Sequence, residues 1–152
     1  MIARKKSPHQ IDRAKLVEPS LSEEEWKEYR TGWELFNHHR FWDAHEAWES
    51  VWKRRYEESR IFFQGIIQLA AAYHLLTVKH RFGGMMRNFE KAEEKLALFP
   101  SSFLGCDVRV LLQAIAAARS EVRRIGSDNL AAFDRSLIPT VQLRSHPLSH
   151  HT

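Results

Sequence analysis

The chain has 152 residues, 43% hydrophobic and 28% charged, which predicts one soluble globular domain with its own core. The net charge of +4 lies entirely in residues 1–15, which hold five basic side chains and one acidic one. A neutral domain argues against a nucleic-acid-binding face and leaves residues 1–15 as the one segment for such binding. The single cysteine, Cys106, excludes an internal disulfide and fits a reducing cytoplasm. Residues 1–20 also lack the continuous apolar run of a secretory signal, so we expect a cytoplasmic protein.

The first 20 residues are basic, contain two prolines and show no apolar period, which predicts a flexible arm. A helix then begins after Ser22, because Ser22 and Glu25 have the spacing of a capping box. Leu21 and Trp26 are spaced for the hydrophobic staple that accompanies such a cap. This helix should end near Asn37. Its buried stripe recurs every three or four residues and consists of Trp26, Tyr29, Trp33 and Phe36.

Two further helices are predicted over about residues 42–54 and 59–78. The second of these is apolar nearly all round and therefore belongs in the centre of a bundle. Because Gln64, Gln68 and His74 interrupt it, we expect a buried helix rather than a membrane span.

Gly83-Gly84 is expected to break the chain before a fourth helix that ends by Pro100. A fifth helix should run from about Asp107 to Gly126, and Ser127 or Asp128 is a candidate cap for a last short helix through Phe133. No segment shows convincing strand alternation. The predicted fold is therefore all-α, with one domain of about five helices over residues 21–143 and a loose tail over 144–152.

Two motifs stand about one helix apart. They are His45-Glu46-x-x-Glu49-x-x-Trp52 and Gln64-Gly65-x-Ile67-Gln68-x-Ala70. Helical periodicity places His45, Trp48, Glu49 and Trp52 on one face, with Gln64 and Gln68 one turn apart on the next helix.

Together the motifs resemble the small helical proteins known as domain of unknown function 309. Supporting residues are Phe36-Asn37, Phe41-Trp42-x-Ala44, Gly84-Met85 and Gly105-x-Asp107-Val108, so that the resemblance covers about residues 28–125. It implies a compact bundle of helical hairpins wound in a left-handed sense, and it implies no activity. The family's characteristic polar positions correspond here to His45, Glu46, Glu49, Gln64 and Gln68.

Polar side chains among tryptophans must find hydrogen-bond partners, and two interpretations supply them. In the first, Glu49 accepts from Gln64 or Gln68 and the cluster is a structural clasp that fixes helix register. In the second, the same residues bind a small polar or cationic ligand in a cavity lined by Trp42, Trp48, Trp52 and Phe63. The predicted ligand-binding residues are His45, Glu46, Trp48, Glu49, Trp52, Gln64 and Gln68.

A third interpretation is metal-assisted, hydrolase-like chemistry, because His45-Glu46-x-x-Glu49 is similar to the zinc motif HExxH. His45 and Glu49 would bind a divalent metal, and Glu46 would act as base. A third ligand is still required, and His38, His39 and His74 are the candidates. Whether the protein is an enzyme, and which cofactor it takes, are left open.

A last alternative is an interaction scaffold, in which stacked helical hairpins offer an exposed apolar groove to a partner. Apolar stripes on several helices are also compatible with a homodimer. Cys106 precedes the fifth helix without a histidine predicted beside it, which favours an inert structural thiol.

Overall fold

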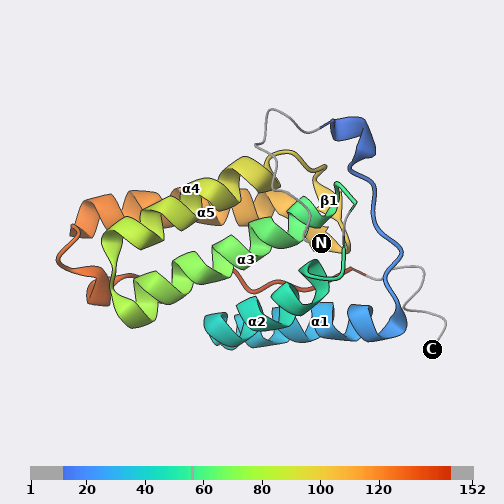
Figure 1. Cartoon of the computed structure of the whole chain (residues 1–152). Coiled ribbons are helices and arrows are strands. Elements are labelled where there is room, and N and C mark those ends of the chain that lie inside the picture. Colours follow the sequence, from blue (N-terminus) through green and yellow to red (C-terminus); the bar gives the residue numbers. More distant parts are fainter. Residues whose placement is uncertain (1–11, 56, 145–152) are drawn as a thin grey trace.

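Helix α3 (Arg60–His74) lies between two other helices along its length (Figure 1). On one side it packs against α2 (Phe41–Trp52) and on the other against α4 (Phe82–Leu96). Helix α1 (Glu23–Asn37) covers α2, and α5 (Val108–Ile125) lies along α4 (Figure 1). The most apolar helix is therefore at the centre, as its sequence predicts.

The structure is a computed structural model that describes residues 12–55 and 57–144. Within these residues the predicted all-α class is confirmed, since five helices pack against one another and strand is almost absent. The remaining elements are the 3₁₀ turns Arg13–Lys15, Leu130–Ala132 and Arg135–Leu137, a π-helical turn over Leu75–Lys79 (the π turn), and the short strands β1 (Ser102–Phe103) and β2 (Cys106–Asp107).

The start of α1 confirms the predicted capping box. Ser22 Oγ accepts from the Glu25 amide at 3.1 Å, and Glu25 Oε1 accepts from the Ser22 amide at 3.0 Å. Leu21 and Trp26 are both buried, as a hydrophobic staple requires. The helix ends at Asn37, as predicted.

Helix α3 and the π turn form one continuous segment, Arg60–Lys79, that is long and apolar enough to cross a membrane. Among the described residues it is the one segment with this property, and 72% of its most apolar window is buried inside the protein. Such burial is consistent with a core helix of a soluble protein.

The expected break at Gly83-Gly84 is wrong, because both glycines lie in the first turn of α4. The chain turns earlier, where the Leu75 carbonyl accepts from the amides of His80 and Arg81, the latter at 2.9 Å. His80 adopts the left-handed conformation, with φ of 53°. A residue other than glycine in that conformation gives no obvious signal in the sequence.

A short β-hairpin precedes α5, and sequence alternation does not reveal strands of two residues. Its turn is Leu104-Gly105, both with positive φ (47° and 75°). The hairpin is fixed to α1 because Tyr29 Oη donates to the Leu104 carbonyl at 2.9 Å.

Helix α5 ends at Ile125, directly before the predicted stop at Gly126, and beyond it the expected last helix is only the 3₁₀ turn Leu130–Ala132. Asn129, rather than Ser127 or Asp128, precedes this turn. The following segment runs back across the bundle to α1, where Asn37 and Val141 exchange two hydrogen bonds of 2.8 Å.

Most of the predicted N-terminal arm and the C-terminal tail lie outside the described residues. The described part of the arm packs on the helices, since Leu16 is buried and Glu18 Oε2 accepts from the Leu104 amide at 2.9 Å. At the other end, Arg144 donates its amide to the Gly105 carbonyl at 2.8 Å.

Candidate functional site

His45 and Glu49 lie one turn apart on α2, but they form only a loose pair. His45 Nε2 is 3.7 Å from Glu49 Oε2, and the same carboxylate approaches Lys53 Nζ at 3.3 Å through its other oxygen. Burial lowers the pKa of His45, and Lys53 adds to this effect, whereas Glu49 and Glu46 oppose it. His45 Nδ1 is buried and has no hydrogen-bond partner among the described residues. Glu46 is exposed on the same helix.

The two glutamines of α3 do not bond to Glu49, which corrects the predicted pairing. Gln68 Oε1 accepts from Lys95 Nζ of α4 at 2.8 Å. Between the glutamines, a Cβ on Gly65 would lie 2.9 Å from Leu96 Cδ2, so this glycine permits α3 and α4 to approach closely. Gly65 and Gln68 of this motif therefore serve the contact between α3 and α4.

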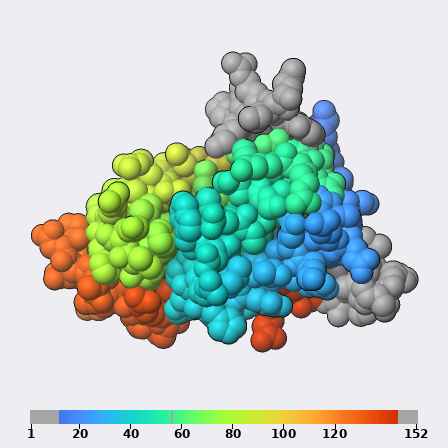
Figure 2. All heavy atoms as spheres, turned by 60° about the horizontal axis from the view of Figure 1, so that its bottom comes forward, coloured from blue at the N-terminus to red at the C-terminus, as the bar shows by residue number. Residues whose placement is uncertain are grey.

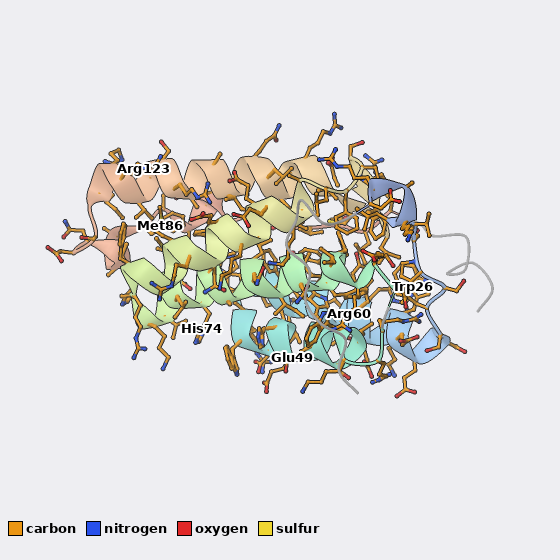
Figure 3. All side chains as sticks on the ribbon, turned by 45° about the horizontal axis from the view of Figure 1, so that its top comes forward. Trp26, Glu49, Arg60, His74, Met86 and Arg123 are labelled. Atoms are coloured by element: carbon orange, nitrogen blue, oxygen red, sulfur yellow. The ribbon has the colours of Figure 1, made fainter. Side chains whose placement is uncertain are left out.

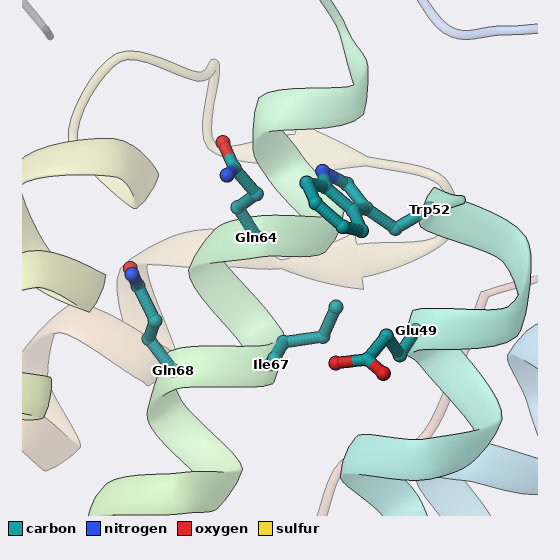
Figure 4. Close-up of a pocket in the computed structure, with 5 residues that line it drawn as sticks. All are labelled: Glu49, Trp52, Gln64, Ile67 and Gln68. Carbon is teal, nitrogen blue, oxygen red and sulfur yellow. The ribbon is translucent and has the colours of Figure 1, made fainter. Parts of the chain in front are cut away.

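A narrow pocket of about 70 Å³ lies between α2 and α3. In Figure 4 the Glu49 carboxylate faces Ile67, whereas the amides of Gln64 and Gln68 point away from it. Organic ligands usually occupy about 300–1,000 Å³, so this pocket suits a few water molecules better. Its lining consists of Glu49, Trp52, Gln64, Ile67 and Gln68.

Trp48 does not line this pocket, contrary to the prediction. Its ring is fully buried against α1, where Nε1 donates to the Tyr29 carbonyl at 3.1 Å and the indole covers Gly32. Phe63, also predicted to line the cavity, is fully buried in the core. Trp52 stays at the pocket, with the Arg60 guanidinium 4.3 Å from its ring centroid.

The third ligand that the metal interpretation requires is not brought to His45 and Glu49 in the part of the chain that the structure describes. Over residues 12–55 and 57–144, no three His, Cys, Asp or Glu side chains are grouped to hold a metal ion. His38 Nδ1 lies 2.8 Å from the Glu34 carbonyl, and His39 stacks on Phe41 at 5.3 Å.

A wider groove of about 480 Å³ opens at the other end of α3, between α2 and the π turn. We call it the Trp42 groove; it is lined by Trp42, His74, Leu75, Val78, Lys79 and Arg81. Figure 2 shows this face, with α2 in cyan beside the π turn and the start of α4 in yellow-green. Figure 3 shows His74 at the end of α3 that lies away from Arg60.

Neighbouring rings fix the orientation of Trp42 in this groove. The indole is 48% exposed and stacks on His45, with centroids 4.6 Å apart and planes inclined by 12°. His74 approaches the same indole at 5.3 Å. His45 thus positions the aromatic wall of the groove although it does not line it.

The charged residues of the groove are cationic. Neither Lys79 nor Arg81 forms an ion pair among the described residues, and no carboxylate belongs to the lining. The pKa of His74 is lowered by burial first, and then by Lys79 and His45.

Comparison with known families matches one segment of the chain. Residues 29–87 match the model of a family described as a domain of unknown function, DUF309. After this match we refer to residues 29–87 as the DUF309 segment. The match is shorter than the resemblance over about residues 28–125 that the motifs predict, and no curated protein matches the chain.

The DUF309 segment contains every residue that lines the narrow pocket and the Trp42 groove. Sequence reasoning placed Trp42 near the site but missed Val78, Lys79 and Arg81. One signal could have indicated Lys79 and Arg81, because Lys79-His80-Arg81 is a basic run at the end of a buried helix. Cys106, by contrast, lies outside the segment and is buried, which raises the pKa of its thiol to about 12.

Proposed function

We propose that this DUF309-containing protein is a small-ligand-binding domain whose ligand occupies the Trp42 groove. The observation that carries the proposal is the groove itself, about 480 Å³ in volume and walled by a half-exposed indole. This volume falls within the range of about 300–1,000 Å³ that organic ligands occupy, and the narrow pocket does not.

The aromatic wall is preorganised for binding. An indole that already stacks on one ring loses little conformational freedom when a ligand covers its outer face. Trp42 meets this condition through His45, and His74 restricts it further. Leu75 and Val78 supply the apolar surface that lines the groove beside the indole.

Two residues of the predicted polar site, His45 and Gln68, then support the groove without lining it. This arrangement combines the clasp and ligand-binding interpretations. Gln68 ties α3 to α4 through Lys95, and His45 holds Trp42 in place. We assign no reaction to the groove. His74 is the one histidine of the lining, and no carboxylate in the lining orients it as a base.

The five tryptophans provide a direct test, because each indole N–H gives its own signal in a proton–nitrogen NMR spectrum. A few hundred soluble fragments would be screened at about 1 mM, a concentration that detects weak first ligands. Trp→Phe variants would assign the five signals. We expect binding fragments to shift the Trp42 signal, while the signals of the buried Trp33 and Trp48 stay in place.

Two outcomes would contradict the proposal. One is a screen in which no fragment shifts the Trp42 signal. The other is a set of fragments that shift only the Trp52 signal, which would assign binding to the narrow pocket instead.

A further inference from the structure

We infer that the Trp42 groove takes an amphipathic anion, with a flat apolar body against Trp42 and one carboxylate or phosphate group beside Lys79 and Arg81. This inference rests on the proposed ligand-binding function and names the chemical class of the ligand. It is drawn from the charge, shape and rigidity of the groove.

The two cations of the groove have no acidic partner among the described residues, unlike several arginines elsewhere in the bundle. Arg54 pairs with Glu28, Arg119 with Glu93 and Arg124 with Glu121. Lys79 and Arg81 have no such partner among the described residues, although both line the same groove. Two neighbouring cations without a counter-charge attract an anion, and the guanidinium can bind two oxygens of an oxyanion at once.

The acidic residues nearest in sequence to Trp42 do not neutralise the groove. Asp43 pairs with Arg40 at 2.7 Å, and Glu46 is not among the lining residues. The groove therefore retains its positive charge while the domain as a whole is neutral.

Hydrogen bonds to two backbone carbonyls hold the segment that carries Lys79 and Arg81 in place. The Leu75 carbonyl accepts from the Arg81 amide at 2.9 Å, and the Thr77 carbonyl accepts from Arg135 Nη2 at 3.0 Å. Arg81 is also the residue that precedes α4, whose first turn contains no acidic side chain, so the helix dipole adds positive potential.

The apolar part of the ligand follows from the rest of the lining. Trp42 is 48% exposed and Val78 54%, and both lie beside the cations. A free inorganic anion would leave this apolar surface in water, whereas an aromatic or aliphatic body would cover it. A second copy of the chain fits less well, because a two-fold contact through this face would bring like charges together.

Three probes with the same naphthalene body separate the contribution of the charged group to binding from that of the apolar body. They are 1-naphthoate, 1-naphthyl phosphate and the uncharged 1-naphthol, each titrated into the full chain while the Trp42 indole signal is followed. We expect at least one anionic probe to bind about tenfold more tightly than 1-naphthol, the size of effect that one charge-assisted contact gives. The tighter of the two anionic probes assigns the head group.

Two double variants, each of which reverses two positive charges, test whether the charge of the groove is responsible. Lys79→Glu with Arg81→Glu should abolish the preference for the anionic probes and leave the affinity for 1-naphthol within about twofold, a difference well under 1 kcal/mol. Lys27→Glu with Arg30→Glu changes the net charge equally on the exposed face of α1 and should retain the preference.

The outcomes distinguish this inference from the function on which it rests. If all three probes bind equally, or if the reversal on α1 has the same effect, the anionic class is wrong and ligand binding stands. If no probe shifts the Trp42 signal while other fragments do, the anionic class is again wrong. If nothing shifts it, both proposals fail.

Discussion

Gln68 Oε1 on α3 accepts a hydrogen bond from Lys95 Nζ on α4 at 2.8 Å. This contact crosses the interface at which Gly65 already brings the two helices close together. The glutamine motif that suggested a catalytic or binding cluster therefore contributes to helix packing.

A double-mutant cycle measures this contact. Gln68→Met and Lys95→Met should each lower the free energy of unfolding by about 1 kcal/mol, because a part-buried bond to a charged donor is lost. Chemical denaturation should show a coupling energy of about 0.5–1 kcal/mol between the two sites. Lys91→Met, one turn earlier on the exposed face of α4, is the control and should not couple to Gln68. Additive effects of Gln68→Met and Lys95→Met would show that the hydrogen bond contributes nothing.

Gly32 is required by the position of Trp48. A Cβ at residue 32 would lie 2.1 Å from Trp48 Nε1, and the fully buried indole has no free space in which to move. Gly32→Ala should therefore lower stability by about 1–3 kcal/mol, although alanine is the better helix former by about 1 kcal/mol. Gly83→Ala on exposed α4 meets only the flexible end of Arg87 at 3.3 Å and should leave the melting temperature unchanged or raise it. Equal effects of the two substitutions would refute this account.

Arg55 ties the loop after α2 to the start of α1 through Glu25. Its Nε donates to Glu25 Oε2 at 3.0 Å, a second bond reaches the other carboxylate oxygen, and Nη2 also donates to the Ser20 carbonyl at 2.8 Å. Lysine cannot reproduce this fork, so Arg55→Lys should cost about 1–3 kcal/mol of unfolding free energy. The more exposed Arg54→Lys serves as control and should cost less than about 1 kcal/mol.

The pKa of Glu25 connects this fork to acid stability. Burial alone would raise it, but hydrogen bonds from Arg55 and the Ser22 amide outweigh burial, and the pKa lies below the usual glutamate value of 4.5. A lowered carboxyl pKa stabilises the fold above the unfolded pKa, and this contribution is lost as the pH falls through the folded value. In Arg55→Lys the free energy of unfolding should therefore fall less steeply as the pH is lowered below 4.5. The same pH dependence as in the wild type would contradict this role.

The burial of two histidines predicts that the free energy of unfolding also depends on pH nearer to neutrality. The pKa of His45 and that of His74 both lie below the usual 6.5, so the folded state binds fewer protons than the unfolded state in this range. Stability should therefore fall as the pH is lowered through about 6.5. His45→Gln should reduce this slope in denaturation series between pH 8 and 5.5, and a slope that stays the same would show that His45 has its ordinary pKa in the fold.

Residue spacing predicts the cap of α1, and all-round apolar character predicts the central place of α3, but neither predicts how the chain turns after α3. The capping box of Ser22 and Glu25 depends on residues three apart, and its geometry follows from that spacing. The turn at His80 could not be foreseen, because it depends on π-helical hydrogen bonds to Leu75 and on a left-handed residue other than glycine.

The candidate site shows the same division. Helical spacing grouped Trp48 with His45 and Glu49, yet α1 covers the side of α2 that carries Trp48, while His45 and Glu49 remain partly exposed. The meeting of Trp42 with His74 and Arg81 depends on how α3 continues into the π turn beside α2, and no spacing within one helix predicts it.

The location of the ligand is tested most directly by the dissociation constant of 1-naphthoate for the wild type, Trp42→Ala and Glu49→Gln, measured by calorimetry. Loss of an aromatic wall typically costs at least about 1 kcal/mol, so Trp42→Ala should weaken binding about tenfold. Glu49→Gln alters the lining of the narrow pocket and reaches the Trp42 groove only through its loose 3.7 Å pair with His45, so it should leave the constant within about twofold. Tight binding that survives Trp42→Ala and is lost in Glu49→Gln would place the ligand between α2 and α3 and contradict the assignment to the Trp42 groove.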